Sequence, residues 1–242
     1  MSTPTAAALG RLEEVVGPGH LIAEPERLAA YEVDGVRPLA AVRPDSPDQI
    51  AEIVRFAAAE KLAVVPMGAR TKLQLGAPPK RCELAIELTR LDRVLAYDPA
   101  DLTLSVEAGI PLAQLQRALA EERQFLPLDP PFAAQATLGG ILATNASWPL
   151  RHANGTARDF VLGLEFITGE GARTKSGARV VKNVAGYDLH KLMIGALGTL
   201  GVITRVNFRT FPLPPASRGF LATFPKFPAA LELRNKIAGS KL

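Results

Sequence analysis

Apolar and polar residues alternate along this chain with two different periods. Apolar residues three or four positions apart predict amphipathic helices, and the clearest begins at Ser46, which can cap it, with Pro47 suited to its first position and Gln49 completing a capping box. Strict alternation predicts half-buried strands, most plainly over 102–108. Further helices are expected at 5–16, 25–31, 111–119, 228–237 and within 180–200, and further strands at 40–42, 63–65, 84–88, 93–97, 160–168, 172–174, 202–211 and 220–224. Residues 40–120 are therefore expected to form one small α/β unit.

The stretch AVVPMGARTKLQL (63–75) changes from an apolar run to a polar turn. We expect Pro66 to end the pairing of a buried strand, and Gly68 to let the backbone turn so that successive N–H groups point the same way. Such a turn, beside the positive charges of Arg70 and Lys72, suits a pyrophosphate. An ordinary strand-to-loop connection with solvated charges is the alternative.

A second glycine-containing turn lies in QATLGGILATN (135–145). Thr137 can cap a helix whose first turn contains Gly139 and Gly140. Bare amides at the start of that helix would make a second anion site, whereas close helix packing through small residues is the alternative. Together the two turns suit one extended diphosphate ligand.

Composition narrows the class of protein. The 242 residues are 48% hydrophobic and 21% charged, which is enough for one or two globular units. The net charge of +4 is spread along a chain with few aromatic residues, so it favours anionic ligands and argues against a nucleic-acid partner. Cys82, the single cysteine, excludes an intramolecular disulfide and fits a reducing compartment. Because Glu13 and Glu14 stand where a signal peptide needs an apolar core, we expect a cytoplasmic protein.

Several familiar motifs are absent from the sequence or wrongly spaced. There is no Walker loop and no Gly-x-Ser-x-Gly elbow, and the glycines of GALGTLG (195–201) have the wrong spacing for a dinucleotide fingerprint and precede a strand. His20, His152 and His190 are too far apart in sequence for a metal motif and are expected at the surface or at helix caps. These patterns exclude a P-loop ATPase and a conventional dinucleotide-binding protein.

Four segments in a fixed order carry a family resemblance: PMGARTK (66–72), LDPPFAAQATLGGILATNAS (128–147), NGTARDFVLGLEFITGEG (154–171) and VKNVAGYDLHKLMIGALGTLGVIT (181–204). Together they resemble the FAD-binding domain of the vanillyl-alcohol oxidase-type, or PCMH-type, FAD-linked oxidases. Within that superfamily the chain is similar to the glycolate oxidase E subunit, the FAD-binding subunit, with the D subunit and D-lactate or D-2-hydroxyacid dehydrogenases near by.

The resemblance implies an α+β fold of two α/β subdomains with FAD extended between them. It implies an N-terminal helical lead-in at 1–37, FAD-binding subdomain 1 at 38–120, FAD-binding subdomain 2 at 121–215, and the start of a truncated substrate or cap domain at 216–242. The cofactor-binding residues that it implies are Pro66, Met67, Gly68, Ala69, Arg70, Thr71, Lys72, Thr137, Leu138, Gly139, Gly140, Thr144, Asn145, Gly155, Asp159, Val202 and Ile203.

By this resemblance the two glycine turns hold the pyrophosphate through backbone amides. Thr144 and Asn145 lie along the flavin, and the backbone of Ile203 meets the adenine. Lys182 and Asn183 match a segment near the cofactor, although Asn183, Tyr187 and Asp188 are also suited to organising a tight turn.

The chain departs from the family pattern in three places. Arg70 and Thr71 stand in the loop where tethered members have a histidine, so FAD is expected to be non-covalent. Ser147 and Trp148 replace the usual Gly-Gly pair. After Pro215 only a segment like a shortened βα unit follows, so the catalytic residues are unknown.

The function implied is the FAD-binding subunit of a 2-hydroxyacid, glycolate-type dehydrogenase that passes electrons from substrate through FAD to a partner. The partners implied are a second flavin subunit and an iron–sulfur subunit, which could bring the protein to the inner face of the cytoplasmic membrane. A non-catalytic FAD-carrying module for electron relay or assembly is the alternative.

Overall fold

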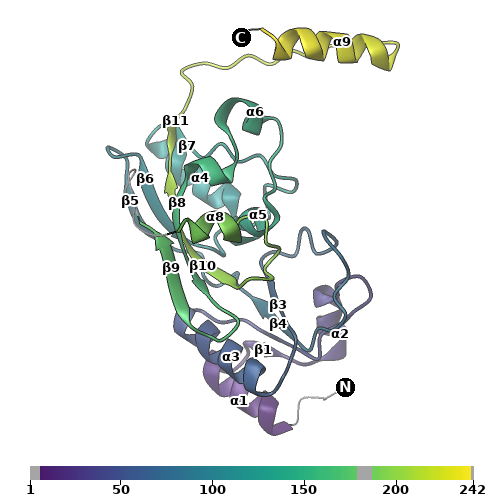
Figure 1. Cartoon of the computed structure of the whole chain (residues 1–242), viewed down its shortest axis with the longest axis vertical. Helices are drawn as coiled ribbons and strands as arrows, with labels where there is room; N and C mark the ends of the chain where they lie inside the picture. Colours follow the sequence, from purple (N-terminus) through teal and green to yellow (C-terminus); the bar gives the residue numbers. More distant parts are fainter. Residues whose placement is uncertain (1–5, 179–186, 241–242) are drawn as a thin grey trace. The chain divides into compact units, whose positions relative to one another are not determined.

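The computed structural model describes residues 6–178 and 187–240 and divides the chain into two units, 1–212 and 213–242. Each unit is described by itself. The α+β expectation is confirmed in the first unit, which contains two separate larger sheets and the helices that pack on them (Figure 1). None of the described helices is long and apolar enough to cross a bilayer.

The first sheet has the order β1-β2-β4-β3, built from β1 (Leu21–Ile22), β2 (Ala40–Val42), β4 (Leu84–Glu87) and β3 (Val64–Met67). The last three strands run parallel, and β1 pairs antiparallel with β2. Side-chain alternation sends Val42, Leu84 and Ile86 into one core cluster and Ala41 and Ala85 into another, so the sheet is buried on both faces.

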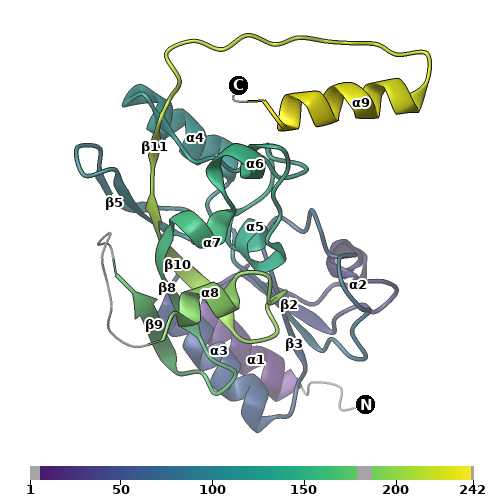
Figure 2. The same cartoon turned by 45° about the horizontal axis from the view of Figure 1, so that its top comes forward.

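Helices cover both faces of this sheet. On one face α1 (Ala6–Val16) and α3 (Pro47–Ala59) lie side by side (Figures 1 and 2). The other face packs against α2 (Pro25–Leu28) and the 3-10 turn η1 (Ala29–Tyr31).

The start of α3 follows the predicted chemistry with one change. The Ser46 hydroxyl accepts a hydrogen bond from Gln49 N at 3.3 Å, as expected of an N-cap. The Gln49 side chain, however, accepts from Asp45 N at 2.9 Å, one residue before the position that a capping box uses.

Strand β3 is longer than predicted. We expected Pro66 to end the pairing, but Pro66 and Met67 stay in register with Ile86 and Glu87 of β4. Because β3 is an edge strand, the missing N–H of a proline can face away from the sheet without loss of a ladder hydrogen bond.

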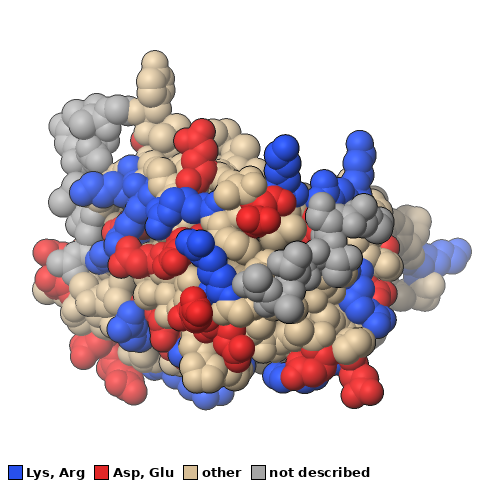
Figure 3. Space-filling view, turned by 90° about the horizontal axis from the view of Figure 1, so that it is seen from below, with Lys and Arg blue, Asp and Glu red and all other residues tan. Residues whose placement is uncertain are grey.

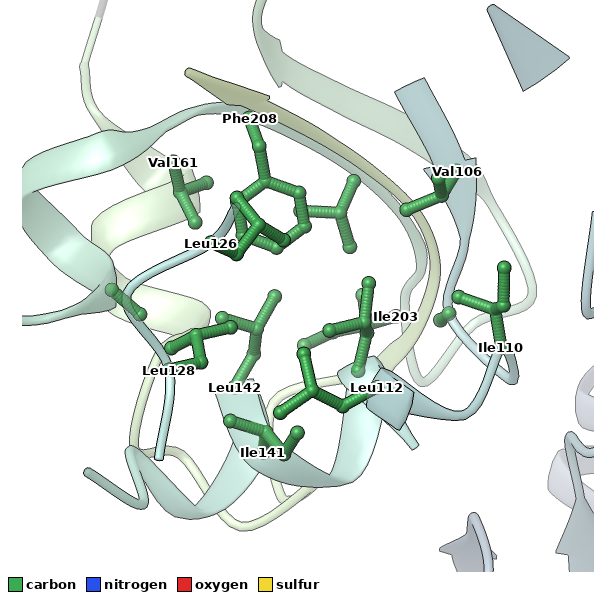
Figure 4. Packing of buried hydrophobic residues seen from close by; sticks show 14 of the residues in the cluster. Val106, Ile110, Leu112, Leu126, Leu128, Ile141, Leu142, Val161, Ile203 and Phe208 are labelled. Carbon is green, nitrogen blue, oxygen red and sulfur yellow. The ribbon is translucent and has the colours of Figure 1, made fainter. Parts of the chain in front are cut away.

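The second sheet has the antiparallel order β5-β6-β10-β8-β9. Its strands are β5 (Val94–Asp98), β6 (Thr103–Glu107), β10 (Val202–Arg209), β8 (Val161–Ile167) and β9 (Arg173–Gly177). One core cluster joins it to α4 (Leu112–Glu121), α5 (Leu138–Thr144) and α7 (Ala157–Phe160), and contains Leu112, Ile141 and Phe208 (Figure 4). The remaining elements are β7 (Gln124–Phe125), paired with β11 (Phe211–Pro212), and the short helices α6 (Leu150–Asn154) and α8 (Leu189–Met193).

The change from the first sheet to the second comes earlier in the chain than the subdomain boundary that the sequence predicts. The boundary between subdomains near residue 120 stays a prediction, but β5 pairs with β6, and β6 pairs with β10, which lies about a hundred residues later in the chain. The two sheets therefore separate between β4 and β5. Alternation identifies these strands correctly but contains no information about which distant strand each one joins.

The second unit contains the helix α9 (Phe227–Ala238), close to its expected position. The strand expected at 220–224 is not present, because no other strand of the described residues pairs with this segment.

Candidate functional site

The two predicted turns meet in space. The loop after β3 approaches the residue that caps α5, and the contact is between Gly68 and Thr137: a β-carbon built on Gly68 would lie 2.0 Å from Thr137 Oγ1. We expected glycine here for its conformational freedom, but the residue with positive φ is Arg70, at 59°. Gly68 instead permits close approach of the two loops.

A cleft of about 450 Å³ opens beside this contact. One wall is β3 and the loop that follows it, and the other includes α5 and Ile203 of β10. The predicted residues that line it are Pro66, Met67, Gly68, Ala69, Arg70, Thr71, Lys72, Thr137, Gly139, Gly140, Thr144 and Ile203.

The loop side of the cleft is rich in free hydrogen-bond donors. Within the described parts of the chain, the backbone N–H groups of residues 68–72 donate to no backbone or side-chain acceptor. Unpaired backbone amides around a left-handed residue are the kind of donors with which a nest binds an anion. The loop therefore has the free donors that the predicted amide cradle needs, and the cradle itself stays a prediction.

The start of α5 is different. Leu138 N donates to Ile110 O at 3.0 Å and Gly139 N to Ala108 O at 2.7 Å, while Gly140 N makes a longer contact of 3.4 Å with Thr137 Oγ1. The expectation of bare amides at this helix start is therefore wrong. The alternative of close packing holds for Gly139, whose added β-carbon would lie 3.0 Å from that of Ala108.

Three cations line the cleft, and two of them are paired. Arg81 binds Glu83 at 2.8 Å, and Arg70 forms an ion pair with buried Glu87 while stacking over the Tyr31 ring at 4.5 Å. Lys72 has no carboxylate partner among the described residues, and burial lowers its pKa. Lys72 is thus the positive charge that this part of the chain offers to an anion in the cleft.

Glu87 organises the floor beneath the loop. Tyr31 donates a hydrogen bond of 2.5 Å to it, Thr89 donates another, and Arg43 lies at 3.3 Å. Burial opposes ionisation of Glu87, but these hydrogen bonds and the Arg70 and Arg43 charges outweigh it and lower its pKa. Burial and the Glu87 carboxylate raise the pKa of Tyr31 to about 12. The Arg70 charge is therefore committed to holding the loop.

A second compartment of about 620 Å³ adjoins the first and shares Arg70, Thr71, Lys72, Leu73, Leu75 and Thr144 with it. Its lining includes the predicted Asn145, together with Ser147, Phe132 and Trp148. The Asn145 Oδ1 and Ser147 Oγ atoms are buried and have no partner in the described structure. The two compartments with Lys72 at their shared wall suit a ligand with an anionic centre and two ends.

Four predicted residues line neither compartment. Leu138 and Val202 lie in hydrophobic core clusters. The Asp159 carboxylate accepts hydrogen bonds from Thr156 N at 2.7 Å and Thr156 Oγ1 at 3.1 Å at the start of α7, and Gly155 lies against this carboxylate.

The segment matched near the cofactor is only partly visible, because Lys182 and Asn183 lie outside the described residues. Tyr187 is exposed, and Asp188 forms an ion pair of 3.0 Å with Lys191. The expectation that all three histidines lie at the surface or at caps is wrong for His190, which is buried and whose Nδ1 lies 3.1 Å from Ser176 Oγ.

Sequence reasoning missed the loop at Leu197–Thr199, which lines the first compartment. Leu197 N donates to Ala143 O at 2.8 Å and ties the loop to α5, and a β-carbon on Gly198 would lie 2.7 Å from Pro66 Cγ. The available signal was the run of glycines in GALGTLG, which belongs to the fourth segment of the family resemblance, although no residue of 197–199 was predicted to bind the cofactor.

One face of the molecule is drawn with its charges in Figure 3. On this face, Lys and Arg side chains are interspersed with Asp and Glu, so charge of one sign does not dominate it. The charge in the cleft, by contrast, is local: Lys72, which is unpaired among the described residues, lies beside free amides.

Comparison with known proteins agrees with this geometry. Residues 38–177 match the family model FAD_binding_4, described as FAD binding domain. The chain is 36% identical over 92% of its length to a D-2-hydroxyglutarate dehydrogenase of Xanthomonas citri and 38% identical over 72% to glycolate oxidase subunit GlcE of Escherichia coli. It covers 48% and 49% of these relatives, so it spans about half their length.

A solved structure of alkyldihydroxyacetonephosphate synthase shares the fold. It superposes with a TM-score of 0.75 at 23% identity, covering 88% of this chain and 45% of that one. The family match includes more than half of the chain and both glycine turns that border the cleft. The chain belongs to the FAD binding domain family.

Proposed function

We propose that this chain binds FAD non-covalently and is the FAD-binding part of a 2-hydroxyacid oxidoreductase of the glycolate oxidase type. The observation that carries the proposal is the row of unpaired N–H groups at 68–72 in a cleft whose one unpaired cation among the described residues is Lys72.

The residues of the cleft fit FAD. Free amides and an ammonium group are the donors that a pyrophosphate requires, and the glycine at position 68 lets the loop that carries them approach Thr137 closely. The orphaned Asn145 Oδ1 and Ser147 Oγ can bind polar groups on a ring edge. We assign the diphosphate to the Lys72 wall, the adenylate to the first compartment, and the flavin to the second one with Thr144 and Asn145.

Bound FAD supplies a hydride acceptor for oxidation at the α-carbon of a 2-hydroxyacid. The chain itself binds and orients. The Glu87–Arg70 pair fixes the loop that carries the unpaired amides, and Lys72, which lines the cleft, neutralises negative charge there. A substrate of the 2-hydroxyacid class is supported by the names of the relatives, which include D-2-hydroxyglutarate dehydrogenase, D-lactate dehydrogenase and glycolate oxidase subunits.

The glycolate oxidase subunits among the relatives support a subunit role. In this proposal electrons leave FAD for partner subunits, one with a second flavin and one with an iron–sulfur cluster, in the cytoplasm or at the inner face of its membrane.

A non-catalytic FAD-carrying module is the second candidate. The lining of the two compartments favours this candidate. Among the described residues, the lining contains no histidine or cysteine, and its one carboxylate, Glu32, is paired with Arg37 at 3.0 Å. No histidine, thiol or unpaired carboxylate among the described lining residues is therefore available there to accept the proton of a substrate hydroxyl.

A visible spectrum of the purified protein, followed by anaerobic addition of glycolate, D-lactate or D-2-hydroxyglutarate, tests both candidates. Flavin bands that bleach on addition support the oxidoreductase. Bands that persist oxidised with every acid support the carrier role for this chain, and absence of flavin after incubation with FAD refutes both.

A further inference from the structure

We propose, on the basis of the proposed FAD site, that Trp148 is a positioning residue that stacks on the flat ring held in the second compartment. Trp148 is the single tryptophan of the chain, and it lines this compartment. Its side chain is 60% exposed, although burial of an indole is strongly favourable. A large aromatic surface left open inside a concave site is suited to a planar ligand.

The backbone of Trp148 is held in place before any ligand arrives. The two carboxylate oxygens of Asp129 accept hydrogen bonds from Trp148 N at 2.7 Å and Leu150 N at 2.9 Å. A fixed backbone reduces the entropy lost when the indole is immobilised against a ligand.

Phe132 gives an independent indication at the same compartment. It is 63% exposed and adopts a left-handed backbone with φ of 58°, which is unfavourable for a bulky residue. Its carbonyl accepts hydrogen bonds from Gln135 N and Ala136 N, both at 2.9 Å, so the turn that leads to Thr137 holds this conformation. The compartment thus presents two open aromatic side chains on constrained backbones.

Polar groups of the same compartment define the kind of ring. Asn145 Oδ1 can accept and Ser147 Oγ can donate or accept a hydrogen bond, and neither has a partner in the described structure. A ring with apolar faces and both N–H and carbonyl groups along one edge matches this set. With a diphosphate at Lys72 between the compartments, the tricyclic flavin ring would occupy the second compartment, which holds these polar atoms and Trp148, and the adenine would occupy the first.

The test compares Trp148→Ala and Trp148→Phe with the wild type, using FAD, riboflavin and ADP as separate probes in titration calorimetry. Riboflavin reports on the ring alone and ADP on the adenylate and diphosphate. Leu192→Ala is the matched control, because Leu192 is similarly exposed, at 59%, and lines neither compartment.

We expect Trp148→Ala to weaken FAD and riboflavin binding roughly five- to a hundredfold, as loss of one aromatic stacking partner does, and to leave ADP binding within about twofold. Trp148→Phe should keep most of the affinity but increase the emission of bound flavin, because phenylalanine does not quench it by electron transfer as indole does. Bound FAD should also protect the tryptophan of the wild type from acrylamide.

Equal riboflavin affinity in Trp148→Ala and wild type, or an equal loss for riboflavin and ADP, overturns the inference. Unchanged flavin emission in Trp148→Phe overturns it too, and this variant keeps the test valid if the alanine protein fails to fold. The proposed function is separable: FAD binding by wild type with no effect at Trp148 refutes this inference alone, and absence of FAD binding by wild type refutes the proposed function as well.

Discussion

Replacing Gly68 by alanine should destabilise the protein by forcing the two cleft loops apart. The new β-carbon would lie 2.0 Å from Thr137 Oγ1, 3.1 Å from its Cβ and 3.3 Å from its Cγ2. A contact of 2.0 Å cannot persist, so either the loop moves or the threonine side chain rotates and ceases to cap α5.

The magnitude follows from these two routes. Overpacking costs about 1–3 kcal/mol, and loss of a threonine cap costs about 1 kcal/mol. Reduced freedom of the unfolded chain returns about 0.4–1 kcal/mol for a glycine-to-alanine change. We expect a net loss of about 2 kcal/mol, which corresponds to a melting temperature lower by roughly 4–8 °C for a chain of this size.

Urea unfolding of a double-mutant cycle checks this reasoning. Thr137→Ala alone should cost about 1 kcal/mol as a lost cap. Combined with Gly68→Ala it should cost less than the sum of the single changes, because the two close γ atoms are gone. Gly169→Ala is the control, since nothing lies within 4 Å of its added β-carbon.

Strict additivity of the two substitutions would refute the proposed contact. So would a Gly68→Ala protein that unfolds at the same urea concentration as Gly169→Ala.

Three further predictions concern the cleft and the buried histidine. Lys72→Met should weaken ADP binding roughly tenfold or more and should reduce the salt dependence of that binding. Calorimetry at two salt concentrations measures both effects. An unchanged dissociation constant would contradict the role of this cation. Gly140→Val should remain folded, because a β-carbon at this position meets only Thr137 Oγ1, at 3.2 Å. It should lose FAD, because Gly140 lines the cleft and the valine methyl groups would take up space there. Retained flavin in the folded variant would count against the site. Burial lowers the pKa of His190 below 6.5, although the Asp188 charge opposes this shift. The unfolded state therefore binds more protons than the folded state at acidic pH. The free energy of unfolding should fall as the pH drops below 6.5. His190→Gln should flatten that dependence in urea titrations, and an unaltered slope would exclude His190 as its source.

Local signals in the sequence were sufficient where a feature depends on neighbouring residues. Ser46 and Pro47 begin α3 as predicted, and Thr137 caps α5, because an N-cap is decided by a few adjacent side chains and amides. The alternation over 102–108 likewise predicts the strand β6, although the residues of both its faces are buried and not those of one face alone.

The sequence also predicted the two turns that border the cleft, through their glycines and charges. It did not predict their chemistry fully. The amides at the start of α5 are occupied by Ala108 O and Ile110 O, which belong to the segment after β6, and the charge of Arg70 is taken by Glu87 of β4. Each of these partners comes from a part of the chain that no local pattern can place beside the turn.

By itself, the sequence therefore predicted the α+β class, the longer helices and strands of the first unit, and the two glycine turns that border the cleft. Only the tertiary structure decided that Gly68 is needed for contact with Thr137, that Lys72 is the cation left unpaired in the described cleft, and that Trp148 lines the second compartment. The physical reason is one of range: caps and alternation act over a few residues, whereas ion pairing, close approach and exposure depend on which distant segments the fold brings together.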